Sequence, residues 1–145
     1  MNLQKIFPVI DLGDIVLREQ QDSDVERFFH YYADPEVNKF ILAEPPRTLE
    51  EARRELYYWR NVFYNNDGIY FGIATKHDNQ MIGSIGLTGS NTYNSRIEIS
   101  YDMAKEFWGQ GIMARAIAAV SKYGFETMGV NRIEAVTSTY NTRSI

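Results

Sequence analysis

The stretch Arg96-Ile-Glu-Ile-Ser-Tyr-Asp-Met-Ala-Lys-Glu-Phe-Trp-Gly-Gln-Gly-Ile-Met-Ala-Arg-Ala116 decides how this sequence folds. Its first eight residues alternate between apolar and polar side chains, which is the period of two expected of a β-strand. The segment Lys105–Gly111 then has the composition of a turn, and apolar residues recur at helical spacing over Ile112–Met128. The sequence therefore predicts a strand, a glycine-containing turn and a helix in direct succession.

Gly109-Gln110-Gly111 stands immediately before that helix. A helix N-terminus carries unpaired N–H groups and the positive end of the dipole, so it binds phosphate readily. Glycine lets the backbone approach such a ligand closely. On these residues alone, a tight strand-to-helix turn without a ligand is an equally open interpretation. A Walker loop and a dinucleotide fingerprint are both excluded, because neither Gly-Lys-Ser/Thr nor a correctly placed third glycine follows.

The rest of the chain predicts a mixed α/β domain. Two capping boxes, in which Ser or Thr precedes Glu by three residues, start at Ser23 and Thr48 and predict two helices. The turn residues Asn65–Gly68 end the second helix. The predicted strands are Ile15–Arg18, the hairpin Ile69–Lys76 with Gln80–Thr88, Arg96–Met103, and Arg132–Thr137. No linker or repeat is visible, so residues 1–145 are expected to form a single domain.

The two early helices show apolar stripes at helical spacing. In the first helix the stripe is Val25, Phe28, Phe29 and Tyr32, and in the second it is Leu49, Ala52, Leu56, Trp59 and Val62. Trp59 is expected in the core. Alternatively, Trp59 could border the acceptor site together with Tyr57 and Tyr58.

Composition limits the classes of function. An apolar fraction of 44% and a charged fraction of 23% are typical of a globular protein. The chain has no Cys, and its two His stand apart, so we expect no metal site, disulfide or cysteine nucleophile. The net charge of −4 comes without a basic stripe, which argues against nucleic acid as a partner. No run approaches the ~20 apolar residues of a membrane span, so a cytoplasmic protein without membrane contact is expected.

The Arg96–Ala116 stretch closely resembles the coenzyme-A-binding strand, turn and helix of the GNAT superfamily of N-acetyltransferases. Within it the stretch is similar to the ribosomal-protein N-terminal (Rim-type) branch, which typically has an acidic strand residue, a Tyr and then Trp-Gly-x-Gly. The match extends to Arg132-Ile-Glu-Ala135 and to Asn141-Thr-Arg-Ser144. The resemblance implies the GNAT fold, a central mixed, mostly antiparallel sheet flanked by helices. The family's C-terminal helix and last strands would be missing, since the sequence ends at Ile145.

The resemblance also implies acetyl-CoA as co-substrate and no metal. The strand backbone at Tyr101 and Met103 would receive the pantetheine arm, and the Asn141 amide would contact it. The pyrophosphate would lie on the backbone amides of Trp108, Gly109, Gln110, Gly111, Ile112, Met113 and Ala114. This chain departs from the family at three positions of the turn and helix, namely Trp108 in place of Gln or Arg, Met113 in place of a small residue, and Arg115 in place of an acid. None of these changes removes a backbone donor.

Two residues are candidates for proton transfer. Glu98 occupies the family's acidic strand position and would act as the general base, because an attacking amine must be neutral. A structural or solvated Glu98 is the alternative. Ser144 matches a serine that would donate to the departing thiolate, and a helix N-cap is its alternative role. Tyr140 is a weaker candidate for that donor.

The function implied by the resemblance is acetyl transfer from acetyl-CoA to a primary amine, foremost the N-terminal amine of a ribosomal protein. Acetylation of a small amine, such as a polyamine, an amino acid or an antibiotic, is a second possibility. A catalytically silent acyl-CoA-binding domain is a third. A monomer or a homodimer is expected.

Overall fold

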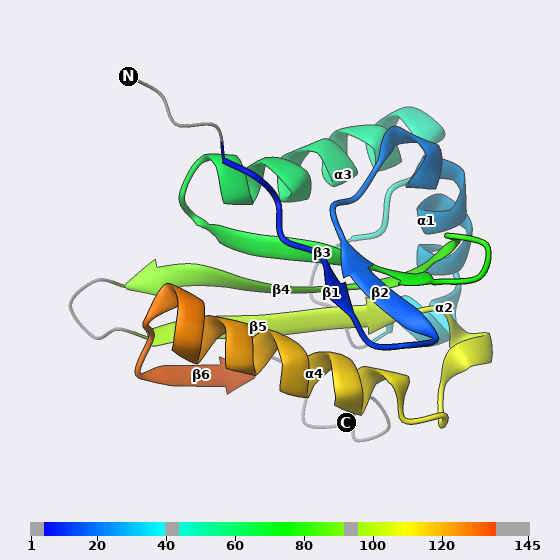
Figure 1. Cartoon of the computed structure of the whole chain (residues 1–145). Coiled ribbons are helices and arrows are strands. Elements are labelled where there is room, and N and C mark those ends of the chain that lie inside the picture. Colours follow the sequence, from blue (N-terminus) through cyan, green and yellow to red (C-terminus); the bar gives the residue numbers. More distant parts are fainter. Residues whose placement is uncertain (1–4, 40–43, 92–95, 136–145) are drawn as a thin grey trace.

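The computed structural model describes residues 5–39, 44–91 and 96–135. Among these residues, six strands form one sheet in chain order (Figure 1). Strands β1 to β5 pair antiparallel with their neighbours, and β5 pairs parallel with β6. The sheet is therefore mixed and mostly antiparallel, as predicted. Its strands are β1 (Ile10–Asp11), β2 (Ile15–Arg18), β3 (Gly68–Thr75), β4 (Met81–Asn91), β5 (Arg96–Met103) and β6 (Arg132–Ala135).

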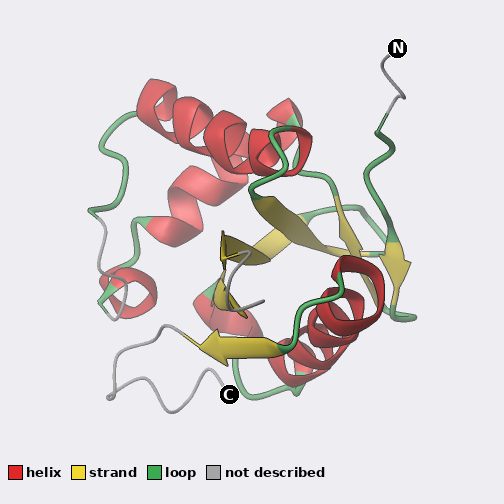
Figure 2. Ribbon diagram, turned by 90° about the vertical axis from the view of Figure 1, so that its left-hand side faces the viewer, coloured by secondary structure: helices red, strands yellow, loops and turns green. Residues whose placement is uncertain are grey.

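Helices cover both faces of the sheet (Figures 1 and 2). Helices α1 (Val25–Tyr32), α2 (Pro35–Asn38) and α3 (Leu49–Tyr64) lie on one side. Helix α4 (Ile112–Tyr123) crosses the other side and continues as a π-helical turn, Gly124–Met128. Gly129, with φ of 73°, ends it as predicted, because glycine adopts this left-handed backbone easily. The sequence did not predict β1 and α2.

The alternation along β5 separates two environments. Ile97, Ile99 and Met103 are buried and pack with α4 in the larger hydrophobic core. Glu98, Ser100 and Asp102 occupy the intervening positions and face the side of α1 and α3. A second, smaller core lies between those helices and the sheet. The polar residues of β5 are therefore next to helices and not on an open solvent face.

Of the two predicted helix caps, the structure contradicts the first and confirms the second. At the first helix, the backbone N–H of Gln21 donates to Asp24 at 2.7 Å, so the predicted box of Ser23 with Glu26 is wrong. The helix is thus capped at Gln21, two residues earlier than predicted, and begins with a 3-10 turn, Asp22–Asp24. At α3, the Thr48 hydroxyl accepts from the N–H of Glu51 at 3.1 Å, which confirms that cap.

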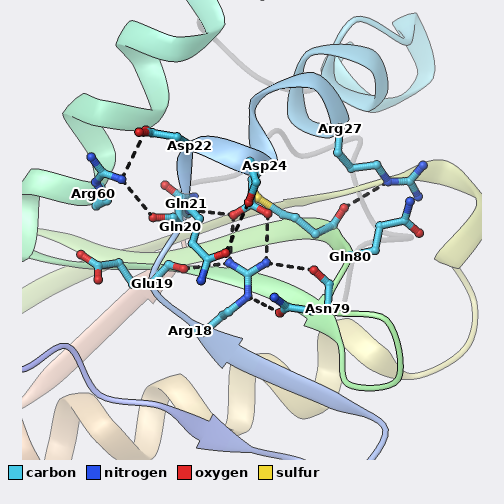
Figure 3. Close-up of polar contacts among 12 residues, drawn as sticks. Arg18, Glu19, Gln20, Gln21, Asp22, Asp24, Arg27, Arg60, Asn79 and Gln80 are labelled. Atoms are coloured by element: carbon cyan, nitrogen blue, oxygen red, sulfur yellow. Dashed lines mark hydrogen bonds and ion pairs between the residues drawn. The ribbon is translucent and has the colours of Figure 1, made fainter.

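The same Asp24 belongs to a buried ion pair that fastens α1 to the sheet (Figure 3). The Arg18 guanidinium donates to both Asp24 carboxylate oxygens at 2.9 Å. Its Nε also donates to the side chain of Asn79, in the turn between β3 and β4, at 2.7 Å. Three segments that are distant in the sequence are thus joined by one arginine.

Candidate active site

The turn before α4 is shaped by two glycines. Gly109 and Gly111 have φ of 78° and 77°, a region that residues with side chains rarely adopt. A Cβ at either position would have no neighbour within 4 Å, so backbone conformation and not lack of space requires glycine here. The outer side of the turn is therefore open. It leads directly into the first N–H groups of α4, which have no acceptor within the helix.

The turn is anchored at both ends. The indole Nε1 of Trp108 donates to the carbonyl of Met103 at 2.9 Å, which ties the turn to the end of β5. On the helix side, Arg115 donates to both carboxylate oxygens of Asp14, at 2.8 and 3.2 Å, and to the carbonyl of Leu12. Arg115 is thus engaged in a contact between α4 and the segment before β2.

The first turn of α4 presents its backbone and hides its larger side chains. Ile112 and Met113 are both 5% exposed and belong to the core, whereas Ala114 is exposed. The bulky Met113 therefore points away from the open side of the turn. The core therefore accommodates the bulk of Met113 without narrowing the turn.

Within the described residues, β6 pairs with the first half of β5. The parallel register runs from Arg96 opposite Arg132 to Ile99 opposite Ala135, where the described part of β6 ends. Beyond Ile99, β5 continues to Met103 paired with β4 on its other side. The predicted strand residues Tyr101 and Met103 thus lie in the part of β5 that leads into the Trp108 turn.

Glu98 is half-buried on the face of β5 that is turned toward α1 and α3. Thr88 of β4 lies opposite it in the register, and a Cβ on Gly89 would lie 3.6 Å from its Oε2. Ser100 and Asp102 follow on the same face at steps of two residues.

Asp102, which the sequence reasoning missed, lies at the centre of a hydrogen-bonded cluster. The Tyr31 hydroxyl of α1 donates to its Oδ1 at 2.6 Å, and the Ser84 hydroxyl of β4 donates to its Oδ2 at 2.7 Å. Burial raises the pKa of Asp102 to about 6, with a smaller contribution from the charge of Glu55, while both hydroxyls lower it. This carboxyl therefore titrates close to neutral pH.

Tyr70 extends the cluster across the sheet. Its hydroxyl lies 2.8 Å from the Ser100 hydroxyl, and its ring lies directly over Gly86. A Cβ at Gly86 would come within 2.2 Å of Cδ2 of that ring. On its other side the ring meets Trp59 of α3, with centroids 4.7 Å apart. Trp59 is half-buried in this position, so it borders the polar cluster and is not in the centre of the core.

Three of the predicted site residues, Tyr140, Asn141 and Ser144, lie outside the described residues. Within the described ranges, no three His, Asp or Glu side chains gather as a metal site would require. None of the helices described is long and apolar enough to cross a membrane.

Comparisons with known proteins agree on one family. Residues 14–145 match the family model described as "Acetyltransferase (GNAT) domain". The Bacillus subtilis protein "Uncharacterized N-acetyltransferase YoaA" is 30% identical over 139 residues, which are 96% of this chain and 78% of that protein. "Putative ribosomal N-acetyltransferase YdaF" from the same organism is 28% identical over 134 residues, 90% of this chain and 72% of that protein.

Solved structures share the fold. A crystal structure described as a probable acetyltransferase superposes with a TM-score of 0.83 and 26% identity, over 94% of this chain and 77% of that one. The ribosomal-protein-S5-alanine acetyltransferase of Vibrio fischeri gives a TM-score of 0.75 and 22% identity, over 94% of this chain and 78% of that one. Together with the family match, this similarity shows that the chain belongs to the GNAT family of acetyltransferases.

Proposed function

We propose that this protein transfers the acetyl group of acetyl-CoA to the N-terminal amine of a protein, and that residues 1–145 form one catalytic domain. The observation that carries the proposal is the turn of Trp108–Ala114. It combines two left-handed glycines, an open outer side and the free N–H groups of a twelve-residue helix. An anionic pyrophosphate fits such a site because the backbone donors and the helix dipole both favour negative charge.

The residues around the turn also fit the rest of the co-substrate. The backbone of β5 at Tyr101 and Met103 runs toward the turn and would hold the pantetheine arm. Asn141 would contact the same arm. When bound, the thioester supplies the acetyl group, while the protein's own groups hold and orient it and handle protons.

We assign proton handling to Glu98 and Ser144. Glu98 is half-buried on the polar face of β5, where it would take a proton from the amine as general base. Ser144 would donate a proton to the departing thiolate.

The acceptor class is supported by the relatives. YdaF is described as a "Putative ribosomal N-acetyltransferase", and the Vibrio fischeri structure as a "Ribosomal-protein-S5-alanine Acetyltransferase". We therefore propose a protein N-terminus as the acceptor. The assays below distinguish two other outcomes, namely acetylation of a small amine and binding of acetyl-CoA without transfer.

Calorimetric titration with acetyl-CoA tests the site. We expect micromolar binding by the wild type and loss of binding in Gly111→Trp, whose side chain would cover the open turn. Gly129→Trp is the matched control, because Gly129 has nearly the same φ, 73°, and the same open surroundings at the other end of the helical segment. Equal binding by wild type and Gly111→Trp would refute the assigned site.

Acetyl transfer is then measured as free thiol released from acetyl-CoA in the presence of short peptides with free N-termini. We expect turnover with a subset of the peptides and none with the same peptides blocked at the N-terminus. Turnover restricted to polyamines or amino acids would move the protein to the small-amine class.

A further inference from the structure

Asp102 lies between the two residues of β5 whose backbone would hold the coenzyme. Just after the strand, the N–H of Ala104 donates to a carbonyl of β4 at 2.7 Å. Backbone groups of successive strand residues point to opposite edges, so those of Tyr101 and Met103 face away from β4. The Met103 carbonyl is bonded to a group outside β4, since it accepts from the Trp108 indole at 2.9 Å. A shift of β5 at Asp102 would therefore displace the backbone groups of both neighbours.

The Asp102 side chain is fixed from two other elements. The Tyr31 hydroxyl of α1 donates to its Oδ1 at 2.6 Å, and the Ser84 hydroxyl of β4 donates to its Oδ2 at 2.7 Å. Ser84 is also the residue opposite Asp102 in the pairing of β4 with β5. The Tyr31 ring is 6% exposed and meets the Phe28 ring edge-on, with centroids 5.8 Å apart, so its hydroxyl has a defined direction. One carboxylate thus joins α1, β4 and β5.

Helix α1 is itself held at two points before Tyr31. The buried pair of Arg18 with Asp24 joins the start of the helix to β2. One turn before Tyr31, Nε of Arg27 donates to a carbonyl of β4 at 3.2 Å, and its Nη2 lies 3.5 Å from Glu106. Residues four apart lie on one face of a helix, so a single face of α1 contacts β4, the end of β5 and the segment that leads into α4. The hydrogen bond from Tyr31 therefore comes from a fixed support.

We propose that Asp102 is a positioning residue, which uses the hydroxyls of Tyr31 and Ser84 to hold the β5 backbone in the place that receives acetyl-CoA. The inference rests on the proposed function, because it takes the backbone of Tyr101 and Met103 as the seat of the pantetheine arm. The described part of β6 ends before this stretch, which is paired with β4 and tied to α1. Asp102 acts through its two neighbours and does not itself contact the coenzyme.

The charge of Asp102 decides how firmly both hydroxyls are bound. An ionised carboxylate accepts from both of them, whereas a protonated one carries a donor, so that one hydroxyl must turn. The titratable groups that act electrostatically on Asp102 are Tyr31 and Tyr32 from α1, Glu55 from α3 and Tyr70 from β3. Burial raises the pKa of Asp102 to about 6. The positioning should therefore be firm at neutral pH and weaken as the pH falls through this value.

Calorimetric titration with acetyl-CoA at neutral pH tests this role without requiring turnover. Tyr31→Phe keeps the ring in the core and removes one hydroxyl, and Ser84→Ala removes the other. Each should raise the Kd about tenfold, the factor that one hydrogen bond to a charged group contributes. Tyr32→Phe is the matched control, because the Tyr32 ring is 5% exposed on the same helix and its hydroxyl makes no hydrogen bond to another described residue. Its Kd should stay within about twofold of wild type.

The pH dependence separates positioning from a purely structural role. Asp102→Asn keeps the shape of the side chain but has no ionisable group. Its Kd should be about tenfold above that of wild type at neutral pH and should match wild type at about pH 5, where Asp102 is mostly protonated. The phosphates of the coenzyme and Glu55 titrate in both proteins, so their effect cancels in the ratio of the two Kd values. A purely structural cluster would leave this ratio unchanged with pH.

Two results would overturn the positioning role: equal Kd values for Tyr31→Phe and Tyr32→Phe, or the same ratio of Asp102→Asn to wild type at neutral pH and at about pH 5. Thermal unfolding shows whether each variant is folded. If Tyr31→Phe is not, Ser84→Ala and Asp102→Asn decide. A wild type that does not bind acetyl-CoA would overturn both this role and the proposed function. Binding that depends on Asp102, without acetylation of any amine, would refute the transfer and support the positioning role.

Discussion

Asp24 and Asp102 are two enclosed carboxylates on the same side of one sheet, and they differ in what compensates their charge. Asp24 meets the Arg18 guanidinium with both oxygens, and the two side chains are 5% and 9% exposed (Figure 3). Asp102 meets two hydroxyls. A guanidinium keeps its charge at any physiological pH, so Asp24 lies against a fixed positive charge. Asp102 lies against hydroxyls instead, and burial raises its pKa to about 6.

The largest loss of stability is expected when the Arg18–Asp24 ion pair is broken. Asp24→Ala leaves the buried Arg18 without its counter-charge, and loss of one partner of such a pair costs about 3–5 kcal/mol of unfolding free energy. Denaturant unfolding at neutral pH measures it. A loss of unfolding free energy below about 1 kcal/mol would mean that the hydrogen bonds of Arg18 to Asn79 and to nearby carbonyls compensate for the missing carboxylate.

The next effect concerns the hydroxyl-bound carboxylate. Because the pKa of Asp102 is raised from 3.8 to about 6 in the folded state, the folded protein binds this proton more tightly than the unfolded chain. The resulting stability is present below pH 3.8 and is lost as the pH rises through about 6. Asp102→Asn has no carboxyl group to bind this proton, so it lacks this pH-dependent contribution to stability. Its unfolding free energy should rise relative to wild type by about 2–3 kcal/mol between pH 4 and 7, at about 1.4 kcal/mol per pKa unit. A constant difference across that range would contradict it.

A steric change tests whether the second site depends on its packing. Gly86→Ala places a Cβ within 2.2 Å of the Tyr70 ring, so the ring must leave its place, at a cost of about 1–3 kcal/mol. Denaturant unfolding of Gly86→Ala and of wild type at neutral pH measures this loss. Gly13→Ala is the control, because its φ of 98° is unfavourable for alanine but its Cβ has open space.

The smallest expected effect comes from removing Asp22, a second acid in the 3-10 turn that contains Asp24. Asp22 lies 3.5 Å from Arg60, but its side chain is 76% exposed, so solvent screens the pair. Asp22→Ala should cost less than about 1 kcal/mol in the same denaturant experiment. A loss equal to that of Asp24→Ala would show that burial is not what separates the two acids.

The sequence predicted the elements whose signals are local. The strand Arg96–Met103 and the stop at Gly129 agree with the structure, because alternation and glycine act within a few residues. The Asp102 cluster was missed because the alternation of β5 places Asp102 where a solvent-facing residue is expected. Its partners Tyr31 and Ser84 come from 71 and 18 residues away. Only the packing of α1 on the sheet brings them together, although the polar run at 98, 100 and 102 was a visible sign.

The capping prediction at Ser23 was wrong for a related reason. Asp24 serves two purposes, since its carboxylate bonds both the Gln21 N–H and the Arg18 guanidinium. A local sequence motif can indicate the bond to the Gln21 N–H, but it carries no information on the ion pair with Arg18. The turn between β5 and α4 was easier to predict, because every residue that forms it is contiguous in the chain.

The two tryptophans of this chain lie in different surroundings. Trp108 donates a hydrogen bond to the end of β5 beside the proposed cofactor turn, and Trp59 lies against Tyr70 beside the polar cluster. Trp59→Phe and Trp108→Phe would each leave a single fluorophore, so the protein contains two separable optical probes. Emission from Trp108 should respond to acetyl-CoA bound at the proposed turn, and emission from Trp59 should report separately on the packing around Tyr70, without any added label.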